Sequence, residues 1–298
     1  AQVSEVIRPG DTVIDLGCGP ATQLAMVARL NPAVEFIGLD LSAEMLSRAE
    51  ETVAAEGLSN VRFQRCDITD LSAFADRSVD AVMSTVVLHH LPDAAALQRT
   101  FAELSRVLKP GGGLYLVDFG HLRAERSIEY FAYLHADHHD ELFTLDYLYS
   151  LRAAFQKDEF QRLTDRYLRG RARLYATLGM PFLVAVKSTI RAEPRASLDA
   201  QLRQERQSLQ RSQQRDLADL TTFFRLGGLK SRFLKRAARR SVRRTIESVL
   251  RQARLRAASS AATPAAVATT AESVSASGQA PPSSATDSMR DDSSAARP

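Results

Sequence analysis

Short apolar runs alternate with helical stretches over the first 120 residues, and this alternation constrains the fold more than any other feature. The expected strands are the apolar or β-branched runs at residues 12–16, 34–39, 61–65, 79–83 and 114–117. Units of this kind fold as a parallel sheet with helices on both faces, and their ligands bind at the carboxyl ends of the strands. We therefore expect an α/β protein whose functional residues directly follow its strands.

Capping residues predict where several helices begin and end. Ser42 can cap a helix over 43–56, and Gly57 is suited to a left-handed stop. Asp93 is expected to cap a helix that ends at Leu108. Further along, residues 144–167 are expected to form two helices, the second of them capped by Asp158.

Polar or glycine-rich segments follow four of the expected strands. The first strand leads into Asp15-Leu16-Gly17-Cys18-Gly19, where glycines let a ligand approach the backbone and the next helix offers free amides. Asp40 follows the second strand and is suited to accept hydrogen bonds from two ribose hydroxyls. Asp67 follows the third strand, and a segment containing His89 and His90 follows the fourth.

In this order and spacing, the motifs resemble those of the class I S-adenosylmethionine-dependent methyltransferases, most closely the small-molecule branch that includes the ubiquinone and menaquinone biosynthesis enzymes. The resemblance covers residues 10–120 and extends more weakly to about 190. It implies a Rossmann-like, mostly parallel seven-stranded sheet with helices on both faces. Residues 173–177 and 182–186 would form the family's terminal antiparallel hairpin.

The resemblance also implies a set of residues that hold S-adenosyl-L-methionine. Asp15 would orient the amino group of the cofactor, Asp40 would bind its ribose, and Asp67 would bind its adenine amino group. The remaining residues would lie under the methionine part or pack on the adenine: Gly17, Cys18, Gly19, Leu41, Met45 and Ile68.

Simpler interpretations of these residues stay open. A glycine loop followed by an acidic residue also fits NAD, although Thr22 stands where the dinucleotide pattern has its third glycine. Asp67 could be only a helix N-cap. Cys18 is interpreted as a small packing residue rather than a nucleophile. Asp70 and Asp80 are interpreted as solvated surface positions.

Histidines are the candidate catalytic residues. A sulfonium methyl is already electrophilic, so the protein has to align a nucleophile in line with it and exclude water. A hydroxyl or an acidic carbon as acceptor also benefits from a general base, which histidine can supply. His90 and His89 are therefore expected to act as a base or to orient the acceptor. Alternatively, the pair only shapes its loop.

A second histidine cluster has the spacing of a metal site, but we do not predict a metal there. His135 and His139 lie four residues apart with carboxylates nearby, a spacing that can bind metal. The resembled family needs no metal, and the surrounding aromatic residues are typical of a lid helix. We expect a substrate-covering segment and no metal here.

Charge is distributed unevenly along the chain. Residues 1–190, the expected catalytic domain, carry a net −6, residues 191–256, an expected basic helical extension, carry +12, and residues 257–298 carry −2. An acidic catalytic domain does not favour a nucleic-acid acceptor. The basic part at 230–256 is expected to form an amphipathic helix that binds an anionic membrane surface or an acidic partner, or that packs on the acidic domain. The Ala/Ser/Thr/Pro tail at 257–298 is expected to be disordered.

The sequence thus predicts a methyltransferase that O- or C-methylates a small molecule by in-line displacement. The alternative is a catalytically silent scaffold of the same fold that acts through its basic helix. Because no run is long and apolar enough to span a membrane, we expect a cytoplasmic protein that can also attach peripherally to a membrane. The chain begins with Ala1 close to its first strand, which predicts that an N-terminal segment is missing.

Overall fold

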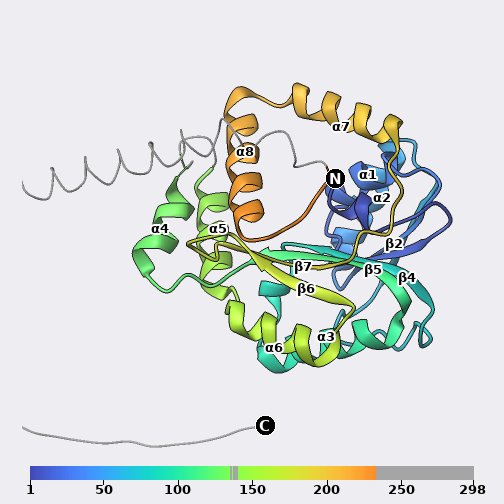
Figure 1. The fold of residues 1–298 in the computed structure, drawn as a ribbon, viewed down its shortest axis with the longest axis horizontal. Helices are drawn as coiled ribbons and strands as arrows, with labels where there is room; N and C mark the ends of the chain where they lie inside the picture. The colour runs from blue at the N-terminus through green and yellow to red at the C-terminus, as the bar shows by residue number, and fades with distance from the viewer. Residues whose placement is uncertain (135, 137–139, 233–298) are drawn as a thin grey trace, which may run out of the picture. The chain divides into compact units, whose positions relative to one another are not determined.

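The computed structural model describes residues 1–134, 136 and 140–232. Its strands form one seven-stranded sheet in the order β3-β2-β1-β4-β5-β7-β6 (Figure 1). The strands are β1 Thr12–Leu16, β2 Glu35–Asp40, β3 Val61–Arg65, β4 Val79–Thr85, β5 Leu108–Phe119, β6 Ala172–Ala176 and β7 Leu183–Ser188. The pairs from β3 to β5 are parallel, and β7 is antiparallel to both β5 and β6. The predicted α/β fold and its terminal hairpin are confirmed.

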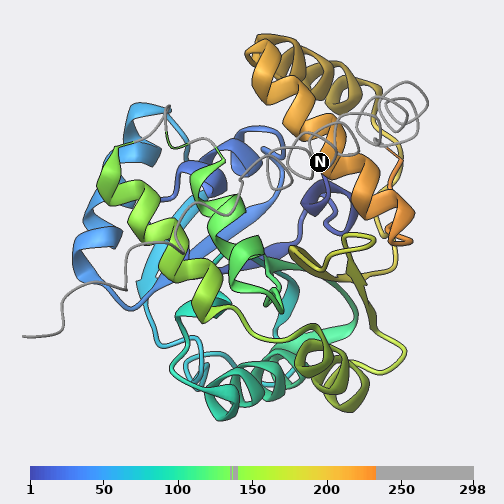
Figure 2. The same ribbon diagram turned by 90° about the vertical axis from the view of Figure 1, so that its left-hand side faces the viewer.

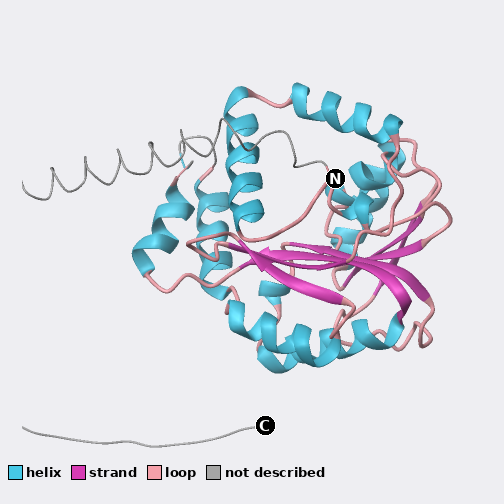
Figure 3. Cartoon of the chain, in the orientation of Figure 1, coloured by secondary structure: helices cyan, strands magenta, loops and turns pink. Residues whose placement is uncertain are grey.

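Helices lie on both faces of this sheet, as Figure 3 shows. The α-helices are α1 Thr22–Arg29, α2 Ala43–Ala55, α3 Ala94–Val107, α4 Glu125–Tyr133, α5 Glu141–Ala153, α6 Lys157–Tyr167, α7 Ala196–Ser208 and α8 Arg211–Leu226. Two short 3-10 helices are also present, η1 Val3–Glu5 and η2 Leu88–His90. In Figures 1 and 2, α4 and α5 lie side by side near the carboxyl end of β5.

Alternation along the strands builds a core on each face. Ile14 belongs to a buried cluster that includes Phe101 of α3 and Phe160 of α6. Its neighbour Val13 points to the opposite face and joins the cluster that includes Leu24 of α1. A third cluster gathers residues of β5, β7, α4, α5 and α8 beyond the sheet. The sheet is therefore covered on both faces, which leaves the carboxyl ends of its strands as the place for a site.

Most of the predicted helix ends are confirmed. The Ser42 side chain accepts from the Met45 amide at 3.2 Å, and the Asp93 side chain accepts from the Ala96 amide at 2.7 Å. Gly57 has a φ of +63°. The prediction for Asp158 was wrong: Gln156 is the N-cap of α6 and forms a capping box with Glu159. The cap thus lies two residues earlier, because Gln156 and Glu159 satisfy each other's backbone amides.

Candidate active site

A glycine loop connects β1 to α1 at the centre of the sheet's carboxyl edge. Gly17 and Gly19 have φ values of +64° and +51°, in the left-handed region that favours glycine. A Cβ on Gly17 would lie 2.5 Å from Cγ2 of Val87, so the loop also passes very close to the segment after β4. No side chain caps the N-terminus of α1. Its first amides are therefore available to a ligand.

Asp40, at the end of β2, is fixed beside this loop. One carboxylate oxygen accepts from the Gly19 amide at 2.9 Å and the other accepts from the Ser42 amide at 2.9 Å. These two bonds orient the carboxylate and use only part of its capacity, because an ionised carboxylate has about four acceptor positions. Asp40 can therefore accept further hydrogen bonds from a ligand that lies on the glycine loop.

Asp15 lies deeper, near the end of β1. Burial, and then the charge of Asp40, raise the pKa of the Asp15 carboxyl to about 8. A cation bound nearby would stabilise its ionised form, so this position is suited to a positively charged ligand. Burial also raises the pKa of the Cys18 thiol well above its usual range, with Asp15 and Asp40 adding to the effect. A thiol held protonated in this way is a poor nucleophile, which agrees with interpreting Cys18 as a packing residue.

Apolar residues continue the site beyond Asp40. Leu41 is 60% exposed, an unusual position for a leucine that directly follows a buried strand. Met45 and Ile68 are half-buried, and Asp67 is exposed. The Cys66 amide donates to the Asp40 carbonyl at 3.0 Å, so the segment after β3 lies beside the end of β2. This juxtaposition places apolar surface next to a carboxylate, as an adenosine group requires.

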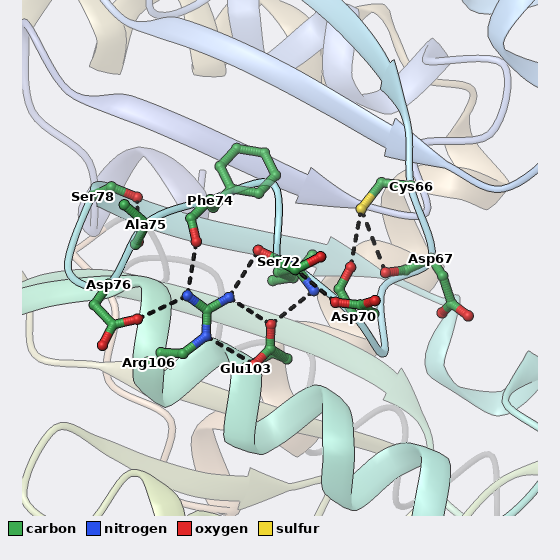
Figure 4. A network of polar contacts seen from close by, with 11 residues as sticks. Cys66, Asp67, Asp70, Ser72, Phe74, Ala75, Asp76, Ser78, Glu103 and Arg106 are labelled. Carbon is green, nitrogen blue, oxygen red and sulfur yellow. Dashed lines mark hydrogen bonds and ion pairs between the residues drawn. The ribbon is translucent and has the colours of Figure 1, made fainter.

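Arg106 and Glu103 of α3 hold the segment after β3 in place through hydrogen bonds, as Figure 4 shows. We call this arrangement the Arg106 clamp. The Arg106 guanidinium donates to the Leu71 carbonyl at 2.8 Å, to the Phe74 carbonyl at 2.8 Å and to Asp76 at 2.9 Å. Glu103 accepts from Arg106 at 2.7 Å and from the Leu71 amide at 2.8 Å. No sequence pattern predicts this clamp, because its residues lie too far apart in the chain for a local pattern to link them.

Two aspartates interpreted as surface positions differ in the structure. Asp70 is exposed, as expected. The interpretation of Asp80 was wrong, because it is half-buried and accepts from the Thr12 amide at 3.0 Å and from Lys109 at 2.8 Å. These two donors lower the pKa of its carboxyl despite its partial burial. Asp80 therefore braces the start of β4, at the opposite end of the strand from the site.

The segment after β4 begins with a strained residue. Val86 has a φ of +55°, which is rare for a β-branched residue and costs of order 1–3 kcal/mol. Its amide donates to the Val117 carbonyl at 2.8 Å, which secures this conformation. The η2 turn with both candidate histidines follows directly. Such strain is concentrated at functional sites, and here it marks the meeting point of the β4 and β5 ends.

His89 and His90 differ in their surroundings. His89 is 4% exposed, and its Nδ1 lies 2.8 Å from Oδ1 of Asp118. His90 is exposed, and its ring centroid lies 4.1 Å from that of His89. Partial loss of solvation and the neighbouring His89 lower the pKa of the His90 imidazole, so it is neutral near pH 7 and can accept a proton. The pairing of Asp118 with His89 was not found from the sequence.

Some of the predicted features lie outside the described residues. His135 and His139 of the rejected metal site are among them, as are positions 233–256 of the basic extension and the whole tail. Within residues 1–134, 136 and 140–232, no group of three or more potential ligands could hold a metal ion. Over the same ranges, no helix is both long enough and apolar enough to cross a bilayer.

Part of the chain is similar to known methyltransferases. Residues 13–112 match a family model described as a methyltransferase domain. The arsenite methyltransferase of Halobacterium salinarum is 39% identical over 113 residues, which cover 38% of this chain and 28% of that protein. A trans-aconitate 2-methyltransferase of Deinococcus radiodurans is 41% identical over 107 residues, which cover 36% of this chain and 37% of that protein. The 27-O-demethylrifamycin SV methyltransferase of Amycolatopsis mediterranei is 34% identical over 114 residues, 38% of this chain and 40% of that protein.

The matched region contains all but the first residue of β1, together with β2 to β4, the glycine loop, Asp40, Asp67 and both candidate histidines. It spans well under half the length of each of these relatives. Residues 13–112 thus match a methyltransferase domain, and the sheet and the site around them are those expected of a class I S-adenosylmethionine-dependent methyltransferase. The residues present fit S-adenosylmethionine: the glycines would leave room for it close to the backbone, Asp15 would ionise beside its cationic part, Asp40 has open acceptor positions, and Leu41 offers exposed apolar surface.

Proposed function

We propose that this protein transfers a methyl group from S-adenosylmethionine to a small-molecule acceptor by in-line displacement. The observation that carries the proposal is the proximity of the glycine loop to the histidine turn, where Gly17 passes against Val87 just before His89 and His90. Because the two segments touch, a methyl donor on the loop would be held next to an acceptor at the turn. Holding both reactants in place is the main requirement for this reaction.

The same proposal assigns positions along the cofactor. Asp15 would face the cationic methionine part, and Asp40 would bind the ribose with the acceptor positions that Gly19 and Ser42 leave open. Asp67 would accept from the adenine amino group. Leu41, Met45 and Ile68 would pack on the ring, with Cys18 filling space beneath the loop.

The acceptor is proposed only by class. The named relatives act on arsenite, on trans-aconitate and on a demethylated rifamycin, three chemically different compounds. Because these compounds differ so widely, the relatives select no acceptor for this chain. We propose a small molecule that is methylated on oxygen or carbon, with His90 or His89 removing or orienting its proton.

Calorimetric titration of the full chain with S-adenosylmethionine tests the cofactor half of this proposal. Asp40→Asn should weaken binding at least about tenfold, because a charge-assisted hydrogen bond to a ribose hydroxyl contributes about 1.5–3 kcal/mol. Asp93→Asn is the matched control, since asparagine caps α3 as well as aspartate does. No measurable binding by the unmodified chain, or equal affinities for the two variants, would reject the assignment.

A further inference from the structure

One buried nitrogen at the site has no hydrogen-bond partner. Within residues 1–134, 136 and 140–232, the buried side-chain atoms without a partner are Nε2 of His89, Nε of Arg191 and the hydroxyls of Thr164 and Thr222. Of these, only His89 lies at the carboxyl end of a parallel strand, just after β4. The other three belong to α6, to α8 and to the segment after β7. His89 is therefore the one whose missing partner points to a ligand.

Asp118, the penultimate residue of β5, determines how His89 is held. Its Oδ1 lies 2.8 Å from Nδ1 of His89 and accepts from the Phe119 amide at 2.6 Å. Its Oδ2 accepts from the amides of Val87, at 2.9 Å, and of Leu88. Asp118 is 1% exposed, so this carboxylate is shielded from water. One side chain thus shapes the η2 turn and contacts the histidine ring.

The contact with Asp118 fixes the tautomer of His89. Both oxygens of Asp118 already accept from backbone amides, so Oδ1 acts as an acceptor toward the ring as well, and the nitrogen that faces it carries the proton. Nδ1 is then the protonated nitrogen, and Nε2 presents a lone pair. The Phe119 ring, with its centroid 5.2 Å from that of His89, supplies apolar surroundings. A lone pair that is buried with no donor is suited to accept the proton of a bound molecule.

We propose that Asp118 is a positioning residue that holds His89 as its Nδ1–H tautomer, so that Nε2 of His89 takes the proton from a hydroxyl group of the methyl acceptor. This inference rests on the proposed function and names O-methylation as its chemistry. As the acceptor oxygen bonds to the methyl carbon, the carbon–sulfur bond breaks and its electron pair stays on sulfur, giving S-adenosylhomocysteine. The hydroxyl proton moves to Nε2, and the imidazolium, stabilised by Asp118, later releases it to water.

Nitrogen-15 NMR of the histidine rings in the full chain tests the tautomer directly. His89→Gln identifies the His89 signals by their loss, and His90→Gln does the same for its neighbour. We expect His89 to be protonated on Nδ1 only at pH 7.5. Asp118→Asn should move the proton to Nε2, because the amide group can donate to Nδ1, as in the corresponding aspartate-to-asparagine change of a serine-protease triad. Asp80→Asn, at the start of β4, is the control and should leave His89 unchanged.

The hydroxyl is tested with two probes of the same shape. In the presence of S-adenosylhomocysteine, phenol should shift the Nε2 signal of His89, whereas toluene, which has no hydroxyl, should not. A proton on Nε2 in the unmodified chain would overturn the inference whether or not Asp118→Asn folds. So would equal effects of phenol and toluene, or no effect of phenol. Calorimetry with S-adenosylmethionine is done on the same sample, so failure of cofactor binding is distinguished from failure of the histidine assignment.

Discussion

Asp15 is the penultimate residue of β1 and Asp40 the last residue of its parallel neighbour β2, and the charge of Asp40 adds to burial in raising the pKa of Asp15 to about 8. Burial and the charge of Asp40 thus disfavour the ionised form of Asp15 until a cation binds nearby. S-adenosylmethionine carries a positive sulfonium and an ammonium group. The relationship between these residues therefore connects the electrostatics of the site to the charge of the proposed cofactor.

The first prediction follows from the raised pKa of Asp15. Between about pH 4 and pH 8 the folded chain keeps a proton on Asp15 that the unfolded chain releases, so this group lowers the free energy of unfolding as pH rises. Each unit of pKa shift corresponds to about 1.4 kcal/mol. Asp15→Asn should therefore lose stability less steeply than the unmodified chain between pH 5 and pH 8, in denaturant unfolding without cofactor. Identical pH dependence in both proteins would contradict the assigned shift.

A second prediction concerns the close approach of Gly17 to Val87. Gly17→Ala adds a Cβ at a positive φ and 2.5 Å from a Val87 methyl, so binding of S-adenosylmethionine should be lost. Gly10→Ala is the control, because Gly10 has a φ of +84° and open space around it. It should cost only the backbone strain of about 1–2 kcal/mol in unfolding and leave cofactor affinity unchanged. The interpretation fails if both variants bind the cofactor equally well.

The Arg106 clamp gives a third prediction. Arg106→Met removes the donors that hold the carbonyls of Leu71 and Phe74, and about 2 kcal/mol of stability should be lost. The affinity for S-adenosylmethionine should fall severalfold, because the clamped segment begins with Asp67 and Ile68. Arg48→Met is the comparison: Arg48 forms only an exposed pair with Glu44, at 2.6 Å, and should change neither quantity noticeably. Unchanged affinity in Arg106→Met would show that the clamp does not support the adenine side.

A buried ion pair away from the site provides a fourth prediction. Lys187 of β7 is paired with Glu5 of η1, and both side chains are almost fully buried. Glu5 also accepts from Ser231 at 2.8 Å and from the Arg232 amide at 2.6 Å, joining three distant segments. Lys187→Met should cost about 3–5 kcal/mol in denaturant unfolding, because it leaves a buried charge unpaired. At denaturant concentrations too low to unfold the variant, its affinity for S-adenosylmethionine should equal that of the unmodified chain. A loss of affinity would show that the ion pair also supports the cofactor site.

The features that could be predicted from the sequence are those set by local chemistry. The predicted strands at 12–16 and 61–65 coincide with β1 and β3. Their limits are predictable because the turn residues that delimit each strand lie next to it in the chain. Ser42 and Asp93 were identified as caps because a cap needs only the amides two or three residues ahead. The prediction of Asp158 as a cap was wrong because Gln156, two residues earlier, forms a reciprocal capping box with Glu159 and begins the helix.

Long-range partners could not be predicted in this way. Asp118 and His89 are 29 residues apart and meet only because β4 and β5 are neighbours in the sheet. Arg106 reaches the segment after β3 across a similar separation. The sequence showed His89 and His90 as an undivided pair, and only the packing of Asp118 distinguishes the buried ring from the exposed one.

The most direct test of the central claim is transfer of a labelled methyl group. The full chain is incubated with S-adenosylmethionine carrying an isotopic methyl label and a cell metabolite extract, and mass spectrometry follows both S-adenosylhomocysteine and labelled small molecules. Gly17→Ala serves as the inactive control. The account predicts S-adenosylhomocysteine together with a labelled product that is absent from the control. Binding of S-adenosylmethionine with no labelled product across varied extracts would contradict it and favour a scaffold that keeps the fold without turnover.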